Sequence, residues 1–252
     1  MKRKIGLQLY TLRAEVKEQG MAAVLKQVKE MGYSEVEPAG FGDLTPKEFA
    51  TACADNGLTI CSAHSIPFDN IAEAVDILGT LGLKWVCIGY GKDQFKDLDS
   101  IKATAEKSNK IIDEFEANGI SVFQHNHYWE YALLDGRIKY DYYLDLCPKV
   151  KLELDIFWAA NFGANEEVPL VKRYADRMVL LHLKDGMFPA NPADQTVDMR
   201  PLGEGQLDIP GIAANLPDKI SQIIVELDRS NIDMTESARR SHDYLVRIGV
   251  GC

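Results

Sequence analysis

Short apolar runs alternate with longer amphipathic stretches along the whole chain. The runs are mostly rich in Val, Ile and Leu and are flanked by polar residues or glycine, as the strands of buried parallel sheets are. The pattern predicts eight strands, at Ile5–Tyr10, Glu35–Pro38, Thr59–Ala63, Trp85–Gly89, Ile120–His125, Val150–Asp155, Met178–His182 and Gln222–Leu227.

The stretches between these runs carry apolar residues at spacings of three and four, which predicts helices with one buried face. Clear cases are Met21–Met31, Pro46–Asn56, Ile71–Leu81 and Ile101–Asn118. A glycine follows each of these four stretches, where a left-handed C-cap favours that residue. The four glycines are Gly32, Gly57, Gly82 and Gly119.

Strand and helix alternate eight times, which predicts parallel strands joined by right-handed crossovers. Eight such units in 252 residues favour one (β/α)8 TIM barrel that spans residues 1–252 as a single domain. The alternative is an open doubly wound sheet, but Gln8–Thr11 after the first strand holds none of the glycines of its phosphate-binding turn. The longest irregular segment, Met187–Gly205, contains three prolines. Since it follows strand seven, we expect it to lie over the barrel mouth as a lid.

Composition narrows the class of partner. Hydrophobic residues make up 46% and charged residues 26% of the chain, and the formal net charge is −10. An acidic chain disfavours nucleic-acid binding, since phosphates are neutralised by Lys and Arg. A chain of this length buries a large core without a structural metal, so any bound metal is expected to serve chemistry. We find no sequence signal for a nucleotide cofactor.

The composition and the apolar pattern together predict a cytoplasmic protein. The five cysteines, Cys53, Cys61, Cys87, Cys147 and Cys252, form no CxxC pair and are interpreted as reduced thiols. No apolar run is long enough for a signal peptide or approaches the roughly 20 residues of a membrane span. We therefore expect no membrane association, and the sequence is compatible with a homodimer.

Polar side chains stand at the carboxyl ends of the predicted strands, where the active sites of TIM barrels form. Four of the five histidines lie at these ends, and only His242 does not. The polar residues that end strands two, three, five, six, seven and eight are Glu37, His64, His125, Asp155, His182 and Glu226.

Taken singly, a histidine at a strand end is usually a hydrogen-bonded packing residue, and a carboxylate is usually a helix cap or an ion-pair partner. Asp155, His182 and Glu226, however, end three adjacent strands and are expected to converge. Bringing these polar and charged side chains together in a partly dry barrel mouth costs free energy unless a bound cation compensates their charge. The mixed oxygen and nitrogen set suits Mn²⁺, Mg²⁺, Co²⁺, Fe²⁺ or Zn²⁺. His125, nearest the tip of strand five, is the expected fourth ligand.

Other residues near these ends are candidates for acid–base chemistry and substrate contact. Lys184, two positions after His182, would hold a substrate oxygen or stabilise an enolate, or else is a solvated lysine. Glu130 would fold back as a ligand or a catalytic carboxylate. The residues expected to contact substrate are Glu37, His64, Trp129 and Trp158, the aromatic rings either stacking on a sugar face or simply packing.

The chain resembles the xylose isomerase-like TIM barrel superfamily, the sugar phosphate isomerases and epimerases. The resemblance covers essentially the whole chain and rests on several motifs. They are Gly6–Arg13, Gly32–Tyr33, Glu35–Glu37, His125–Glu130, Glu153–Trp158, His182–Asp185, Leu202–Gly205 and Val225–Asp228.

The resemblance implies a metal held by residues of strands five to eight. It also implies proton removal next to a carbonyl, with isomerisation, C3-epimerisation, dehydration of inososes or elimination on 3-keto-glycosides as outcomes. Typical members carry a glutamate at the strand-five ligand position, which falls here on Gln124 or His125. Glu130 matches a glutamate that contacts substrate in epimerase-like relatives. A further branch repairs abasic DNA, and the acidic balance of this chain argues against it.

Several functions therefore remain open. We expect a metal-dependent isomerase or epimerase of a sugar or sugar derivative, with Glu226, Glu130 and His127 as acid–base candidates and Lys184 as an electrophilic helper. The alternative is a lyase or dehydratase of keto-sugars or inososes that uses the same site. A third option is a sugar-binding barrel without catalysis.

Overall fold

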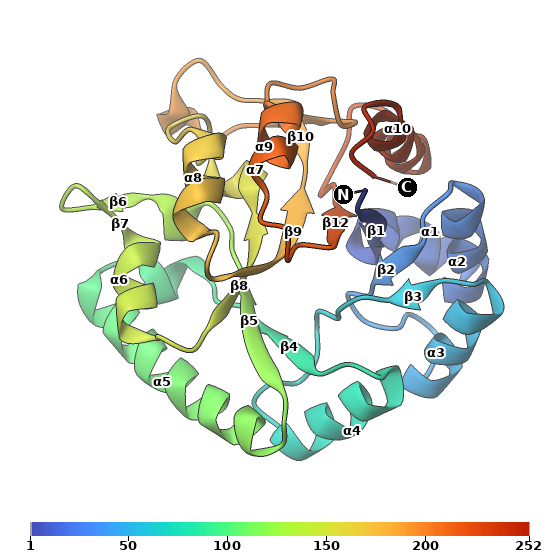
Figure 1. The fold of residues 1–252 in the computed structure, drawn as a ribbon, viewed down its shortest axis with the longest axis horizontal. Coiled ribbons are helices and arrows are strands. Elements are labelled where there is room, and N and C mark those ends of the chain that lie inside the picture. The colour runs from blue at the N-terminus through green and yellow to red at the C-terminus, as the bar shows by residue number, and fades with distance from the viewer. Residues whose placement is uncertain (1, 252) are drawn as a thin grey trace.

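The computed structural model describes residues 2–251. Its centre is an eight-stranded parallel sheet with the strand order β3-β2-β1-β12-β9-β8-β5-β4, curled around a common axis (Figure 1). The strands are β1 (Lys4–Gln8), β2 (Glu35–Glu37), β3 (Thr59–Ile60), β4 (Trp85–Ile88), β5 (Ser121–His125), β8 (Lys151–Asp155), β9 (Met178–Leu183) and β12 (Gln222–Val225).

Each of the eight predicted runs is a strand of this sheet, and the (β/α)8 barrel is confirmed as the fold class. Each strand is hydrogen-bonded to the next from β3 at one edge to β4 at the other, and no ladder joins β3 to β4. A side chain spans this gap, because the indole N–H of Trp85 donates to the carbonyl of Cys61 at 3.1 Å. The curled sheet is thus held at its open edge by a side-chain contact in place of a ladder.

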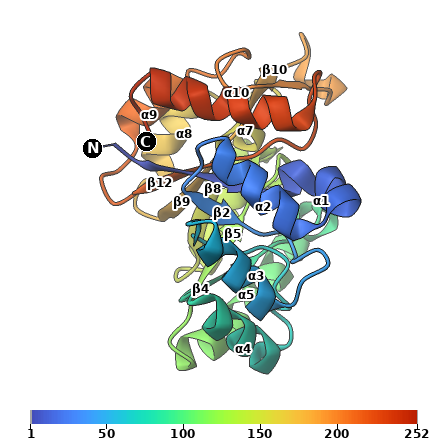
Figure 2. The ribbon, with the colours of Figure 1, turned by 90° about the vertical axis from the view of Figure 1, so that its right-hand side faces the viewer.

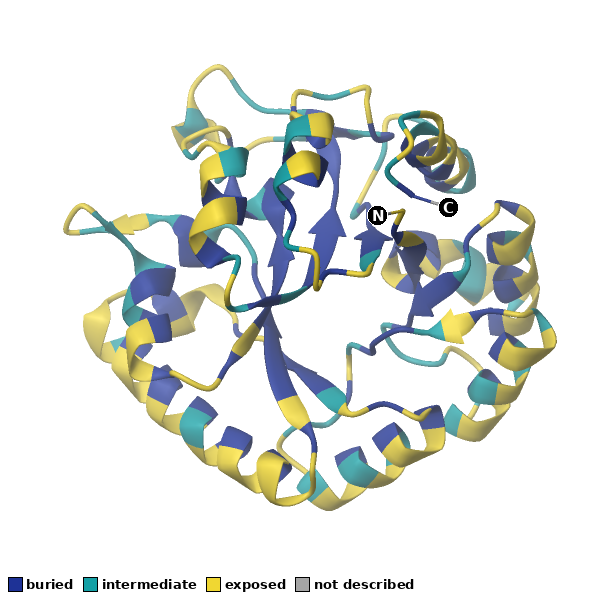
Figure 3. Ribbon diagram, viewed as in Figure 1, coloured by how far each residue is buried: buried dark blue, intermediate teal, exposed yellow. Residues whose placement is uncertain are grey.

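Helices surround the sheet and cover its outer face (Figures 1 and 2). Most of them bury one side, and their outward faces are exposed while the strands are mostly buried (Figure 3). The helices are α1 (Arg13–Gln19), α2 (Met21–Glu30), α3 (Pro46–Asp55), α4 (Ile71–Leu81), α5 (Leu98–Ala117), α6 (Lys139–Leu146), α7 (Ile156–Ala159), α8 (Glu167–Tyr174), α9 (Ile209–Asn215) and α10 (Met234–Arg247).

The observed helix ends agree closely with the predicted ones, except at the start of α5. The four glycines expected after helices all have positive φ, for example 71° at Gly82. Helix α5 begins at Leu98, ahead of the predicted Ile101, because the Asp97 side chain accepts the Ser100 N–H at 2.9 Å and caps an earlier turn. Strand β1 ends at Gln8 because the 3-10 helix η1 (Leu9–Leu12) follows it directly.

The segment Met187–Gly205 is more regular than its sequence suggests. It contains the short helix η4 (Pro192–Asp194) and strand β11 (Asp198–Arg200). Strand β11 pairs antiparallel with β10 (Asp185–Met187), and a second small hairpin joins β6 (Leu133–Leu134) to β7 (Arg137–Ile138). The expectation of an irregular segment is therefore corrected, since main-chain pairing with β10 orders its second half.

The interior of the barrel is layered. A small apolar cluster is formed by Phe123, Leu180 and Ile224 together with two cysteines. Because side chains alternate along a strand, the residues two positions later face the same way. These are His125, His182 and Glu226, so the sheet itself places the polar strand ends above an apolar floor.

Two further findings concern the cysteines and the membrane. Four cysteines are free thiols in the described structure, while Cys252 lies outside the described residues. From residue 2 to residue 251, no helix has the length and apolar character needed to cross a membrane.

Candidate metal centre and active site

Four side chains from neighbouring strands meet at the carboxyl end of the sheet. His125, Asp155, His182 and Glu226 each offer one ligand atom, and these atoms all lie within 4.8 Å of one another. Nε2 of His125 is 3.5 Å from Oδ2 of Asp155 and 3.8 Å from Oε2 of Glu226. All four residues are buried, so we call this group the four-ligand cluster.

The sheet fixes the position of this cluster through backbone pairing. Asp155 is the register partner of His182, and the Glu226 N–H donates to the Leu183 carbonyl at 3.2 Å. Asn126 clamps strands β5 and β8, because its side chain accepts the Asp155 N–H at 2.9 Å and donates to the Asp155 carbonyl at 3.0 Å. Asp155 also caps α7 by accepting the Trp158 N–H at 2.9 Å.

A buried lysine provides positive charge at this cluster. Nζ of Lys184 lies 2.9 Å from Asp155 Oδ2, 2.9 Å from Glu226 Oε2 and 2.8 Å from Asp228 Oδ2. Burial alone would lower the pKa of Lys184, but the three carboxylates raise that pKa well above its ordinary value. Burial likewise opposes ionisation of Glu226, yet Lys184 and the neighbouring histidines hold its pKa well below the usual range.

His182 lies between carboxylates on both edges of its ring. Nδ1 is 2.7 Å from Glu226 Oε2, and Nε2 is 2.6 Å from Glu37 Oε2 and 3.1 Å from Glu153 Oε1. Although burial disfavours the charged ring, these carboxylates raise the pKa of His182 well above its ordinary value. The ring orientation is thus fixed from the side opposite the cluster.

A second group of titratable side chains, which we call the lower group, shares His182 with the four-ligand cluster and is completed by Glu37, His64 and Glu153. Its atoms bond to one another: His64 Nε2 lies 2.6 Å from Glu153 Oε2, and Glu37 accepts from Gln8 at 2.7 Å as well as from Ser62. We interpret this lower group as a hydrogen-bonded support for His182.

The four-ligand cluster fits a divalent cation better than the lower group does. His125 Nε2 and Asp155 Oδ2 are buried and form no hydrogen bond in the described structure; Asp155 Oδ2 lies 2.9 Å from Lys184 Nζ and 3.5 Å from His125 Nε2. Unsatisfied buried nitrogen and oxygen atoms aimed at one point are what a metal ligand set requires. His125, Asp155, His182 and Glu226 are the residues that would hold it.

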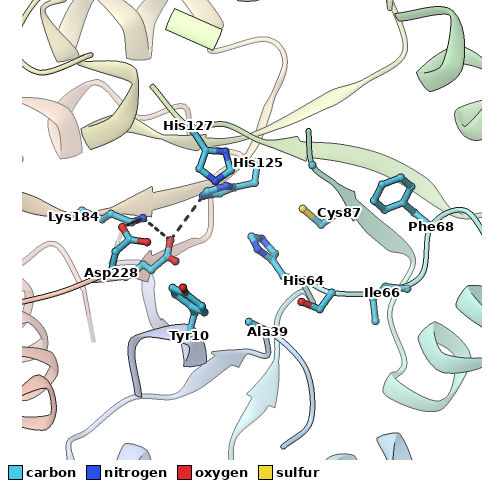
Figure 4. Close-up of a pocket in the computed structure, with 13 residues that line it drawn as sticks. Tyr10, Ala39, His64, Ile66, Phe68, Cys87, His125, His127, Lys184 and Asp228 are labelled. Carbon is cyan, nitrogen blue, oxygen red and sulfur yellow. Dashed lines mark hydrogen bonds and ion pairs between the residues drawn. The ribbon is translucent and has the colours of Figure 1, made fainter. Parts of the chain in front are cut away.

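The cluster opens into a cavity of about 360 Å³ (Figure 4). Lys184 and Asp228 lie at one end of this cavity, Ile66 and Phe68 lie at the other, and His64 projects between them. A cavity of this size, with a few convergent polar groups, suits one small molecule. The remaining lining residues are Tyr10, Ala39, Ser65, Cys87, Gly89, His125, His127 and Glu226.

Comparison with known proteins places the chain in a family. Residues 25–248 match the xylose isomerase-like TIM barrel family. The chain belongs to that family. Among curated proteins, none matches this sequence.

Solved structures of xylose isomerase-like barrels resemble this one along nearly their whole length. A sugar phosphate isomerase/epimerase from Parabacteroides distasonis is 25% identical with a TM-score of 0.79, covering 97% of this chain and 94% of its own. The 3-keto-D-glucoside 4-epimerase of E. coli is 18% identical (TM-score 0.73; 98% and 100% covered). A barrel from Mycobacterium smegmatis in complex with magnesium is 16% identical (TM-score 0.71; 98% and 97% covered).

In this xylose isomerase-like barrel, the acid–base candidates occupy different environments. His127 lines the cavity, and burial, together with the nearby His125 and Lys184, lowers its pKa to about 3. Glu130 is fully buried outside the cavity lining, where burial raises its pKa to about 8. Its Oε2 accepts the His127 N–H at 3.0 Å, so Glu130 supports the backbone of the strand-five end.

The residues expected to contact substrate are likewise divided. His64 lines the cavity, whereas Glu37 is fully buried in the lower group beneath His182. Trp158 lies beside the cavity with its ring 5.6 Å from Lys184 Nζ, and Trp129 lines a separate cavity. Position near a strand end therefore does not by itself distinguish residues that line the cavity from residues that lie outside it.

Asp228 and Tyr10 are among the cavity residues that the sequence pattern does not indicate as site residues. Asp228 holds Lys184 and lines the cavity, and a signal for it exists, since it stands two positions after Glu226 and faces the same way. Tyr10 lines the cavity from η1, where Arg13 stacks on its ring at 4.2 Å. A tyrosine in a turn after a strand has no comparable sequence signal.

Proposed function

We propose that this chain is a divalent-metal-dependent isomerase or epimerase of a sugar or sugar derivative, which removes a proton next to a carbonyl and passes through an enediolate. The observation that supports it most strongly is the four-ligand cluster, two members of which, His125 and Glu226, line a cavity sized for one small molecule. Supporting this, the solved relatives include enzymes named as sugar isomerases and epimerases.

The ligand set indicates which residues would hold the proposed metal. A divalent cation held by His125, Asp155, His182 and Glu226 would supply a Lewis acid for the carbonyl and hydroxyl oxygens of the substrate. Lys184 would stabilise negative charge on a substrate oxygen, because its ammonium borders the cavity and has a raised pKa.

Two groups on different strands would move the proton. The ionised carboxylate of Glu226 lines the cavity and would remove a proton from the carbon next to the carbonyl. His127, neutral at pH 7 and carried by the segment after β5, would exchange a proton with the substrate from another side. Return of the proton to the neighbouring carbon gives isomerisation, and return to the other face gives epimerisation.

Solvent exchange tests this proposal across a panel of candidate sugars. Ketoses and 3-keto-glucosides would be incubated in D₂O with Mn²⁺-loaded protein and followed by proton NMR. We expect deuterium uptake next to the carbonyl of one of them, loss of uptake after EDTA, and recovery with Mn²⁺. Uptake unaffected by EDTA, or none with the whole panel, would overturn the proposal.

A matched pair of variants ties the chemistry to the cluster. Asp155→Asn keeps an oxygen that can cap α7 but removes the ionic ligand, so exchange should fall at least about 100-fold. Asp198→Asn, on β11 and away from the cavity lining, should retain exchange. The same spectra separate the lyase alternative, since only elimination releases water or an aglycone.

A further inference from the structure

A second cavity of about 440 Å³ lies beside the first. Its walls come from η2 (Lys92–Phe95), from η3 (Trp129–Tyr131) and the preceding Tyr128, and from the start of α6. The segment 187–205 supplies a further wall through Pro192 and Gln195. Because three lysines line it, at 92, 96 and 139, we call it the lysine pocket.

The two cavities share a wall made of stacked rings. His127 lines the first cavity, Trp129 lines the lysine pocket, and their ring centroids are 4.2 Å apart at an interplanar angle of 12°. Tyr128 packs edge-on against Trp129 at 5.1 Å. A molecule that fills the first cavity and extends past His127 would therefore reach a surface of aromatic rings, on which sugar faces commonly stack.

The lysine pocket concentrates positive charge on a protein whose net charge is −10. Its lining holds three lysines and a single carboxylate, Asp93. In the described structure no carboxylate lies within ion-pair distance of Lys92 or Lys139, and Lys96 reaches only Asp97, at 3.9 Å. An excess of ammonium groups over carboxylates in one pocket favours an anionic ligand.

Lys139 is the most enclosed of the three lysines. Its Nζ donates to the Lys96 carbonyl at 3.3 Å, which fixes the ammonium at the pocket wall. Burial and the nearby Lys92 together lower the pKa of Lys139, so a bound anion would relieve an existing repulsion.

The backbone is strained at two residues that line the lysine pocket. Asn161 and Gln195 line the pocket with φ values of 48° and 50°, in the left-handed region that non-glycine residues seldom adopt. Phe162, next to Asn161, has a φ of 58°. Strain of this kind gathers at ligand sites, and here it occurs on two segments far apart in sequence.

We propose that the lysine pocket binds an anionic distal part of an extended substrate, a sugar unit or similar group that carries a carboxylate or a phosphate, while the reacting sugar occupies the first cavity. This inference rests on the proposed function for the reacting end. Lys92 and Lys139 bind the anion, Trp129 and Tyr128 contact the distal ring, and the His127–Trp129 stack separates the two units.

Binding of inert probes tests the pocket independently of turnover. Methyl β-cellobioside has no free carbonyl, and it would be compared by calorimetry with its 6′-carboxylate and 6′-phosphate counterparts on the Mn²⁺-loaded protein. We expect at least one of the two anionic probes to bind at least about tenfold more tightly than the neutral probe in 20 mM NaCl. The preference should shrink in 200 mM NaCl as charge is screened.

Matched double variants assign the preference to the pocket. Lys92→Gln with Lys139→Gln should abolish the preference for anionic probes and change the affinity of the neutral probe less than twofold. Lys26→Gln with Lys47→Gln makes the same change in net charge on α2 and α3, across the barrel, and should keep the preference (Figure 1). Melting curves of both variants check that the fold persists.

The outcomes distinguish this inference from the proposed function. Equal affinity for neutral and anionic probes, a preference that survives the Lys92/Lys139 change, or no probe binding at all would overturn the lysine pocket. Absence of deuterium exchange in the solvent experiment would overturn the proposed chemistry while leaving a measured anion preference in place.

Discussion

His182 Nε2 lies 2.6 Å from Oε2 of Glu37, on the edge of the ring opposite the four-ligand cluster. The other ring nitrogen, Nδ1, lies 2.7 Å from Glu226. Glu37 therefore occupies the position from which a carboxylate orients a metal-ligating imidazole and selects its tautomer. A hydrogen bond from Nε2–H to Glu37 leaves Nδ1 to face the proposed cation site.

Glu37→Gln should weaken metal binding without removing a ligand. An amide accepts the imidazole N–H less strongly than a carboxylate, and losses at such positions typically reduce metal affinity about 10–100-fold. Titration calorimetry with Mn²⁺ measures the change. Glu35→Gln is the matched control, since Glu35 lies two residues earlier on β2 and pairs with Lys4 at 3.0 Å. Affinities within threefold of the native protein for Glu37→Gln would exclude the positioning role.

Lys184→Met should raise metal affinity and reduce turnover at the same time. In the metal-free protein the Lys184 ammonium neutralises Asp155 and Glu226 at 2.9 Å from each, so an arriving cation competes with it. We expect Mn²⁺ to bind about tenfold more tightly to Lys184→Met, and deuterium exchange to fall at least about 100-fold because a charge-stabilising group is lost. Lys219→Met, at an exposed lysine bonded to the Asp176 carbonyl, serves as the control. Weaker Mn²⁺ binding to Lys184→Met would contradict the competition.

The sequence predicts the scaffold well, because few choices remain once strands and helices alternate. Strand order and side-chain alternation together place Asp155 beside His182, and both are legible as patterns. Its position nearest the tip of strand five makes His125 the expected ligand, and in the structure His125 lies in the four-ligand cluster while neither end of the Gln124 side chain is hydrogen-bonded.

The sequence does not predict the conformation of loops or how deeply each strand-end residue is buried. The sequence predicts that Glu130 folds back toward the site as a ligand or a catalytic carboxylate, whereas η3 buries its side chain outside the cavity lining, 4.0 Å from His127 Nδ1. Glu37 and His64 both stand at the ends of predicted strands, yet Glu37 is fully buried whereas His64 lines the cavity. The ring pair His127–Trp129 depends on a short turn whose conformation no periodicity predicts.

Asp185 organises the loop that follows strand seven, and its removal should destabilise the protein. Its carboxylate accepts four backbone N–H groups, from Gly186, Gly203, Gly205 and Leu207, at 2.8–3.2 Å. Asp185→Ala leaves these donors unpaired, and since those of Gly186 and Leu207 are buried, the change should cost about 2–4 kcal/mol of unfolding free energy. Urea unfolding measures it.

Asp198, in the same β10–β11 hairpin, provides a control for the Asp185 prediction. Asp198→Ala removes a carboxylate that bonds only the Arg200 side chain, at 2.6 Å, and should change stability by less than about 0.5 kcal/mol. Hydrogen exchange should accelerate at residues 203–207 in Asp185→Ala alone. An unfolding free energy of Asp185→Ala within about 1 kcal/mol of the native protein would show that water replaces the carboxylate at no cost.

Cys53 should make the protein less stable in alkali, in a defined pH range. The thiol is buried on α3, and burial raises its pKa from 9.0 to about 12. The folded state therefore keeps the proton more firmly than the unfolded state, so the contribution is complete below about pH 9 and is lost as pH rises toward 12. Between pH 8 and 10.5, the native protein should lose up to about 2 kcal/mol more than Cys53→Ala. Urea unfolding at both pH values gives the difference, and iodoacetamide should leave Cys53 unmodified in the folded protein at pH 8. Equal losses in the two proteins, or rapid alkylation of the folded chain, would show that this thiol reaches solvent.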